Sequence, residues 1–117
     1  MITVHGIKNC DTVKKARQWL TDNGVDYQFR DVREFPLTAD EVKQWLTQLP
    51  ATTLINKRSS SWRALSEQQQ QLQDSDAIAN LIVAHPTLFK RPLVDNHGKL
   101  SVGFNAQQWQ QQLSAAT

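Results

Sequence analysis

A strand-helix-strand pattern in the first 32 residues constrains the fold of this chain more than any other feature. Residues 2–5 and 26–32 each alternate apolar with polar side chains, as half-buried strands do. Between them, apolar residues recur at the spacing of a helix that buries one face, at Val13, Ala16 and Leu20. Because a β-α-β unit connects parallel strands, we expect these two strands to be parallel.

Residues 37–86 show helical patterns instead. Thr38-Ala39-Asp40-Glu41 is a capping box, in which the first and last side chains satisfy free backbone donors at a helix start. Short helical turns are expected around residues 53–55 and 62–65, and a longer helix is expected over about residues 76–84. This stretch therefore reads as a helical insertion.

The pattern returns to strands near the C-terminus. Residues 92–95 and 100–102 are strand-like, and a turn over residues 96–99 separates them, which predicts a β-hairpin. Asn105 is a favourable N-cap for a final helix that buries Trp109.

The order of these elements predicts an α/β fold with one mixed four-stranded sheet. A β-α-β unit and a β-β-α unit build the sheet, and the helical insertion lies between them. We find no repeat and no linker, and 117 residues suffice for one hydrophobic core. We therefore expect a single domain over residues 1–117, with its sheet-containing core over about 1–35 and 88–117 and the insertion over about 37–86.

Composition and motifs argue against several classes of protein. No run of about 18 apolar residues is present, and the first residues lack the pattern of a secretory signal, so neither a membrane span nor export is expected. A single cysteine forms no internal disulfide, which fits a cytoplasmic protein. The net charge of +2 is too small to indicate nucleic-acid binding, and no nucleotide-binding glycine motif appears. Nothing indicates an oligomer, so a monomer is expected.

The single cysteine, Cys10, stands just before the first expected helix. A helix N-terminus stabilises a thiolate, which makes Cys10 a candidate nucleophile; a free cysteine is also commonly a small buried apolar residue, and position alone leaves both open. Asp11 or Thr12 can cap this helix, and an Asp11 carboxylate facing the sulfur would oppose the thiolate. The three histidines show no ligand spacing, so no metal site is expected.

Three segments give the chain a resemblance to a known family. They are residues 5–16 (HGIKNCDTVKKA), residues 91–94 (RPLV) and residues 102–105 (VGFN). Together they resemble the ArsC/Spx family of arsenate reductase-like proteins, which have a thioredoxin-like fold. Within that family the chain is most similar to the YffB-like members, which are often described as reductases.

The resemblance implies roles for particular residues. Cys10 would be the nucleophilic thiol, Arg91 would face it and hold an anion, and Arg58 would be a second anion-binding arginine. The peptide bond before Pro92 would be cis. The loop residues that would complete the site for an anion or thiol substrate are Asn9, Asp11 and Thr12.

The chain departs from the arsenate reductases at two places. No arginine stands in residues 102–105, where a third site arginine would be expected, and Asp11 occupies a position where glycine is common. Arsenate is therefore not the expected substrate.

A single thiol cannot complete a reductive cycle alone, because its mixed disulfide needs an outside thiol for resolution. Glutathione is the expected co-substrate, and Arg58 and Arg91 suit its carboxylates. We therefore expect a glutathione-dependent thiol reductase that acts on an oxidised thiol or an oxyanion and needs neither a metal nor a nucleotide.

The same resemblance leaves a second hypothesis open. Spx-type relatives act by contacting RNA polymerase, so the chain would instead be a protein-binding module that uses the helix over residues 38–49 and the insertion. Val13 stands where a Cys-x-x-Cys switch would place its second cysteine, so an internal redox switch of the Spx kind is excluded.

Overall fold

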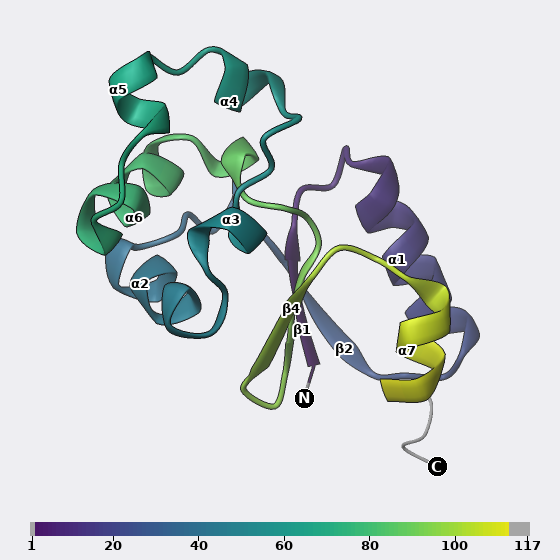
Figure 1. The fold of residues 1–117 in the computed structure, drawn as a ribbon. Coiled ribbons are helices and arrows are strands. Elements are labelled where there is room, and N and C mark those ends of the chain that lie inside the picture. Colours follow the sequence, from purple (N-terminus) through teal and green to yellow (C-terminus); the bar gives the residue numbers. More distant parts are fainter. Residues whose placement is uncertain (1, 113–117) are drawn as a thin grey trace. The chain divides into compact units, whose positions relative to one another are not determined.

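The computed structural model describes residues 2–112, and the packing of the chain divides into two compact units. The first unit joins the two ends of the chain, up to Asp31 and from Arg91 onward, and the second unit is Val32–Lys90. In Figure 1 the first unit has the purple and yellow-green ends of the colour scale, and the second is largely teal and green.

The first unit contains the expected mixed four-stranded sheet. Its strands are β1 (Ile2–Gly6), β2 (Tyr27–Asp31), β3 (Leu93–Asn96) and β4 (Lys99–Val102), in the order β2-β1-β3-β4. The strand β1 is parallel to β2 and antiparallel to β3, and β3 and β4 form the hairpin. Both the predicted β-α-β unit and the predicted hairpin are confirmed.

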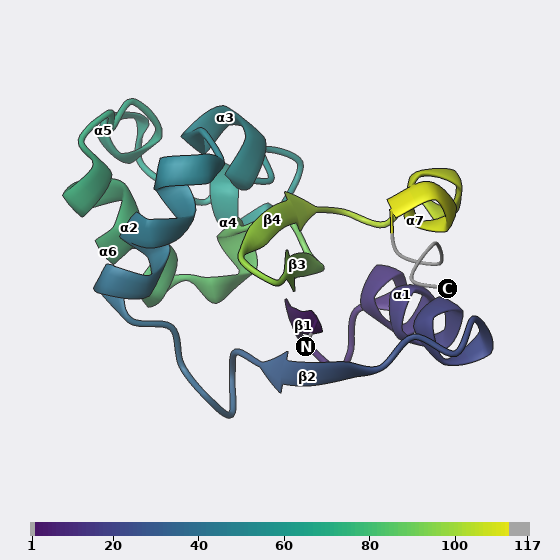
Figure 2. The same ribbon diagram turned by 90° about the horizontal axis from the view of Figure 1, so that it is seen from below.

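Helices α1 (Asp11–Asp22) and α7 (Ala106–Gln112) cover the same face of this sheet, as the two views in Figures 1 and 2 show. The rings of Trp19 and Trp109 meet edge to face with centroids 5.6 Å apart, and the ring of Phe104 packs on Trp109 at 4.8 Å. Each such aromatic pair contributes about 0.5–1.5 kcal/mol beyond its buried area. The buried cluster around them is Ile2, Val4, Ala16, Leu20, Val94 and Trp109.

The second unit is helical, as expected. Its helices are α2 (Ala39–Gln48), α3 (Ala51–Leu54), α4 (Ser60–Arg63), α5 (Glu67–Gln70), α6 (Ser75–Ala84) and a 3₁₀ turn over Pro86–Leu88. The helix α2 packs against α6, and an ion pair of 2.8 Å joins Lys43 Nζ to Asp76 Oδ1. Thr38 Oγ1 accepts the backbone N–H of Glu41 at 3.2 Å, which confirms the Thr38 half of the predicted capping box at the start of α2.

The short helices α3 and α4 begin earlier than the sequence patterns predicted, and side-chain caps set the starts of α4 and α5. Ser59 Oγ accepts the N–H of Trp62 at 3.1 Å, so α4 begins at Ser60 rather than near residue 62. Ser66 and Gln69 form a reciprocal capping box that starts α5. The expected cap of α1 was also wrong, since Cys10 occupies the N-cap position and Asp11 and Thr12 lie in the first turn.

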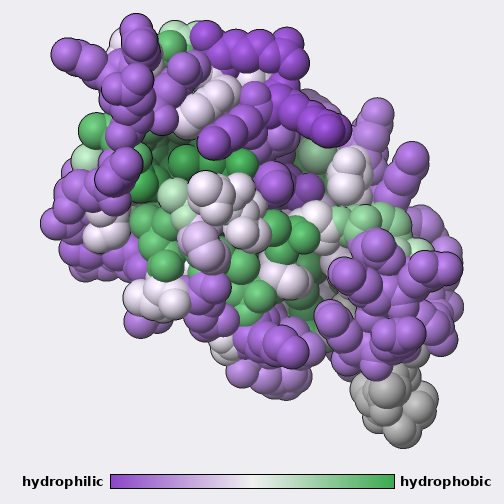
Figure 3. Space-filling model, viewed as in Figure 1, coloured by the Kyte–Doolittle hydropathy of each residue, from purple (hydrophilic) through white to green (hydrophobic). Residues whose placement is uncertain are grey.

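The outward face of α7 is rich in glutamine, and Figure 3 shows hydrophilic side chains over this helix. The exposed glutamines are Gln107, Gln108, Gln110, Gln111 and Gln112. Within residues 2–112, no helix combines the length and the apolar character that crossing a bilayer requires.

Candidate functional site

The cysteine loop and the Arg91–Pro92 segment lie at the same end of the sheet. The strand β1 ends at Gly6 and leads into the loop that carries Cys10. The strand β3 runs antiparallel to β1, and its first residue, Leu93, pairs with His5. Antiparallel strands run in opposite directions. The segment that precedes β3 and the segment that follows β1 therefore lie at the same end of the sheet. Register alone therefore brings Arg91 and Pro92 to the end of the sheet that carries the thiol loop.

Gly6 lets the end of β1 approach α1 closely. A Cβ atom at this position would lie only 2.8 Å from Cγ2 of Val13, which is fully buried. The Cys10 N–H then donates to the Ile7 carbonyl at 3.2 Å, which closes the turn between β1 and α1. Gly6 is thus a packing requirement of the cysteine loop.

Asp31 also holds this loop. Its Oδ2 accepts the backbone N–H of Lys8 at 3.3 Å, and the side chain is only 6% exposed at the end of β2. A buried carboxylate is costly unless it is hydrogen-bonded, so this contact favours one loop conformation. Sequence reasoning missed Asp31, because its partner lies 23 positions away and no local pattern marks the pair.

Cys10 is half-buried at the N-cap of α1. Its backbone is extended, with φ of −107° and ψ of 122°, and its carbonyl accepts the N–H of Lys14 at 3.0 Å. The sulfur makes no capping hydrogen bond. Across the part of the chain that the structure describes, no hydrogen bond uses the first-turn N–H groups of Asp11, Thr12 and Val13. These donors are oriented toward the start of the helix, where they stabilise negative charge.

The peptide bond between Arg91 and Pro92 is cis, which is the conformation that the family resemblance implies. The Nε and Nη1 atoms of Arg91 are buried and have no hydrogen-bond partner within the described residues. A guanidinium group has five donors and no acceptor, so only an electron-rich group can satisfy it. Since an unsatisfied buried donor on a charged group is costly, the arrangement is complementary to an anion.

The segment that follows β4 serves packing and capping. The Gly103 N–H donates to the Pro92 carbonyl at 2.9 Å, and the φ of Gly103 is +84°, a conformation that glycine adopts without strain. Asn105 Oδ1 accepts the N–H of Gln108 at 3.0 Å, which confirms its predicted role as a helix cap. No side chain in this segment supplies a third cation.

Arg58 belongs to the second unit, and its role beside Cys10 stays a prediction. Its N–H donates to Asn56 Oδ1 at 3.1 Å, and its carbonyl accepts Nη2 of Arg63 at 3.0 Å. The side chain of Arg58 is exposed. The other residues expected at the site, Asn9, Asp11 and Thr12, are also exposed, and they lie within two positions of Cys10 in the sequence.

His5, the histidine that lies nearest to Cys10 in the sequence, is engaged with an arginine. Its Nδ1 lies 3.2 Å from Nη1 of Arg30, its neighbour on β2, and the His5 ring is only 7% exposed. Because a guanidinium can only donate, Nδ1 must be the acceptor. Within residues 2–112, no group of three histidine, cysteine, aspartate or glutamate side chains could hold a metal ion.

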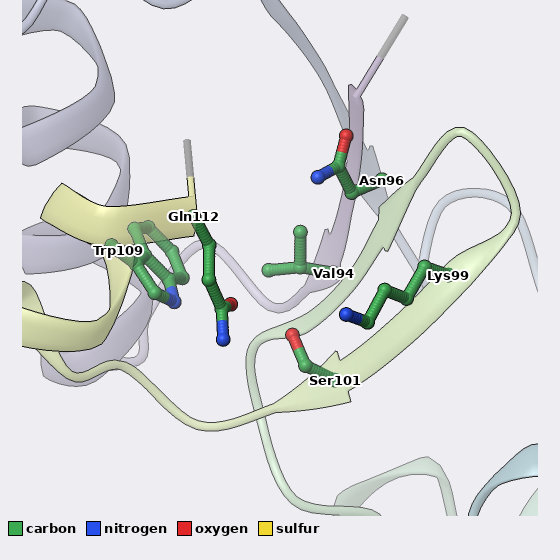
Figure 4. A pocket seen from close by; sticks show the side chains of 6 residues that line it. All are labelled: Val94, Asn96, Lys99, Ser101, Trp109 and Gln112. Atoms are coloured by element: carbon green, nitrogen blue, oxygen red, sulfur yellow. The ribbon is translucent and has the colours of Figure 1, made fainter. Parts of the chain in front are cut away.

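The described part of the first unit contains a small hollow and an open groove. One, between the β3-β4 hairpin and α7, has about 20 Å³ of space, enough for a water molecule but not for an organic substrate. Figure 4 shows the side chains that line it, with Trp109 and Gln112 coming from α7. The other is an open groove of about 310 Å³ along α1 and β2, lined by Lys14, Arg17, Gln18, Thr21 and Tyr27.

Comparisons with known proteins agree with this architecture. Residues 5–112 match the sequence profile of the ArsC family. The solved structure of a YffB protein has a TM-score of 0.89 and 31% identity, and the match covers 97% of this chain and 99% of that one. An arsenate reductase (ArsC) related protein from Brucella melitensis has a TM-score of 0.77 and 39% identity, with 94% and 92% covered. The global transcriptional regulator Spx of Bacillus subtilis is 31% identical over 107 residues, which are 90% of this chain and 81% of the regulator.

Proposed function

The chain belongs to the ArsC family, and we propose that it is a thiol-based oxidoreductase in which Cys10 is the nucleophile and glutathione is the co-substrate. The observation that carries this proposal is the pair of buried, unpartnered donors on Arg91, at the same end of the sheet as the thiol loop. The unpaired N–H groups at the start of α1 support it, because they favour a thiolate at Cys10.

The proposed reaction is two successive thiol-disulfide exchanges. The Cys10 thiolate attacks one sulfur of a disulfide, so that a new S–S bond forms to Cys10 while the old S–S bond breaks. The displaced thiolate takes a proton from water. A glutathione thiolate then attacks the substrate sulfur of the mixed disulfide, so that a new S–S bond joins glutathione to that sulfur while the S–S bond to Cys10 breaks, and the electron pair of the broken bond regenerates the Cys10 thiolate.

Arg91 would hold a carboxylate or another anionic group of the substrate through Nε and Nη1. Arg58 would add a second contact from the insertion, as the family resemblance implies. Arsenate is not the proposed substrate, because residues 102–105 contribute a glycine turn, an aromatic contact and a helix cap, and no arginine.

Incubation with glutathione disulfide, followed by intact-mass measurement, tests the nucleophile. We expect wild-type protein to gain one glutathionyl group that excess glutathione removes, and we expect Cys10→Ser to gain none. Faster alkylation of Cys10 by iodoacetamide in the folded than in the urea-unfolded protein would show that the fold activates the thiol. A wild-type protein that stays unmodified would rule out the proposed reaction.

The two arginines provide a matched pair of variants. Loss of a hydrogen-bonded charge contact costs about 1.5–3 kcal/mol, so we expect Arg91→Gln to slow the reaction with glutathione disulfide roughly ten- to hundredfold. Arg58→Gln removes the same charge from an exposed position, and a smaller effect is expected from it. Equal and negligible effects from both variants would contradict the assigned role of Arg91.

The similarity to Spx regulators suggests a second candidate function, a protein-binding module that contacts RNA polymerase. We propose to test it by measuring binding to that enzyme. Both hypotheses place the protein in the cytoplasm. Retention of purified RNA polymerase on the immobilised chain, equal for wild type and Cys10→Ser, would favour a binding module. Absence of retention, together with reversible glutathionylation, would favour the oxidoreductase.

A further inference from the structure

The open groove on the first unit is rich in donors that have no acceptor. Lys14 and Arg17 on α1 line it together with Tyr27 on β2. Within the described residues, no ion pair or hydrogen bond involves the Lys14 ammonium or the two Nη atoms of Arg17. The Gln18 amide donates a hydrogen bond to Asp22 Oδ1 at 2.7 Å, so the nearby Asp22 carboxylate pairs with this amide and not with Lys14 or Arg17. The groove therefore presents two cations without a counterion.

Arg17 is held in place on two sides. Its Nε donates to the Tyr27 hydroxyl at 3.2 Å, and its guanidinium carbon lies 4.0 Å from the centre of the Phe29 ring. These contacts fix the plane of the guanidinium group and reduce the entropy that binding would cost. The two Nη atoms are left for a bidentate contact, which matches the geometry of a carboxylate.

The groove follows the helix face that begins at the thiol. Cys10, Lys14, Arg17 and Thr21 are spaced four, three and four residues apart, which places them along one side of α1. With a rise of 1.5 Å per residue, Lys14 lies about 6 Å and Arg17 about 10 Å from Cys10 along the helix axis. A tripeptide is at most about 10 Å long when extended, so a tripeptide thiol bonded to Cys10 can reach Lys14 and approach Arg17 with a carboxylate.

We infer that this groove binds a carboxylate of the anionic thiol whose sulfur exchanges with Cys10. The inference rests on the proposed function for the sulfur chemistry, and it adds the recognition of the co-substrate. It assigns Lys14 and Arg17 as specificity residues that select thiols and disulfides carrying a carboxylate within about 10 Å of the reacting sulfur.

The rates at which two disulfides modify Cys10 test this selection. Glutathione disulfide carries carboxylates, and bis(2-hydroxyethyl) disulfide is neutral. We expect Lys14→Gln and Arg17→Gln each to slow modification by glutathione disulfide about three- to fivefold, as exposed charge pairs do, with little change for the neutral disulfide. Lys15→Gln is the matched control, because Lys15 is an exposed lysine of α1 that does not line the groove. An equal loss in Lys15→Gln, or an equal loss with both disulfides, would overturn the inference.

Binding of S-methylglutathione, which cannot form a disulfide, separates this inference from the proposed function. We expect it to shift the backbone amide resonances of α1 in an NMR titration, and we expect Arg17→Gln to weaken those shifts. If these shifts occur while Cys10 is inert to disulfides, the groove is supported and the proposed reaction fails. If Cys10 reacts but S-methylglutathione leaves α1 unchanged, the groove assignment fails.

Discussion

Two short loops of this protein, residues 7–10 and residues 56–59, each lead into a helix. The side chain of the last residue caps the helix N-terminus in the second loop but not in the first. At α4, Ser59 Oγ accepts the N–H of Trp62 at 3.1 Å, so one first-turn donor is satisfied within the loop. At α1, Cys10 occupies the same cap position but its sulfur accepts no hydrogen bond. Serine and cysteine differ by one atom. The serine hydroxyl caps the N-terminus of its helix, whereas the cysteine leaves the first-turn N–H groups of its helix available to a negative charge.

Under the proposed function, this difference separates a structural loop from a reactive one. The residue 56–59 loop is closed on itself, since Ser59 Oγ also donates to the Asn56 carbonyl at 2.8 Å. The cysteine loop is closed by its backbone hydrogen bond from Cys10 to Ile7, and it is further anchored by Asp31 through Lys8 and by the close approach of Gly6 to Val13. Positioning from outside holds the thiol in place without using the donors that surround it.

The largest expected effect comes from closing the space at Gly6. Gly6→Ala places a methyl group 2.8 Å from the stiff, fully buried Val13 side chain, so we expect a loss of about 1–3 kcal/mol in the free energy of unfolding. Urea denaturation measures this loss. In the Gly6→Ala, Val13→Ala double variant, the two losses in unfolding free energy should be less than additive. Full additivity would mean that the side chains at positions 6 and 13 do not clash.

The cap of α4 provides the next effect. Ser59→Ala leaves the Trp62 N–H without its acceptor, and we expect it to lower the free energy of unfolding by about 1 kcal/mol. Ser59→Cys copies the cap that α1 has, and a similar loss is expected because sulfur is a weak acceptor. A cysteine at this position that stabilised as well as serine would remove the contrast between the loops.

The reciprocal change at α1 should have the opposite sign. A serine hydroxyl at position 10 can accept a first-turn N–H, so we expect Cys10→Ser to raise the free energy of unfolding by about 0.5–1 kcal/mol while it abolishes glutathionylation. Paired urea denaturation and intact-mass experiments measure both. A destabilised serine variant would indicate that the sulfur contributes more through packing than the cap would restore.

The smallest effect concerns the ion pair between α2 and α6. The hydrogen bond from Lys43 to Asp76, with the attraction of that carboxylate, raises the pKa of Lys43 above its ordinary value of 10.5. A group whose pKa is raised by folding stabilises the folded state fully below its unfolded pKa, and this contribution is lost as the pH rises through the folded value. The small difference in unfolding free energy between wild type and Asp76→Asn should therefore be present at pH 8 and should decline above about pH 10.5. A difference that does not change with pH would exclude the ion pair as its source.

The helices and strands, and their order along the chain, follow from short-range patterns in the sequence. Periodicity at Val13, Ala16 and Leu20, the Thr38 cap, the hairpin turn and the Asn105 cap all depend on residues within one turn or two of each other. Such signals act through local backbone geometry, so they are visible in the chain before it folds. The boundaries of α3 and α4 were predicted less well, because helices of four residues have no apolar repeat.

The contacts that hold the candidate site come instead from packing between segments that are distant in the sequence. The Asp31–Lys8 contact spans 23 positions, and the buried donors of Arg91 and the fixed guanidinium of Arg17 depend on neighbours from other elements. Cys10 was recognisable as a candidate from its position, whereas its uncapped state depends on where the sulfur points once α1 has formed. Burial and orientation arise from packing between distant segments, and no spacing along a single sequence encodes them.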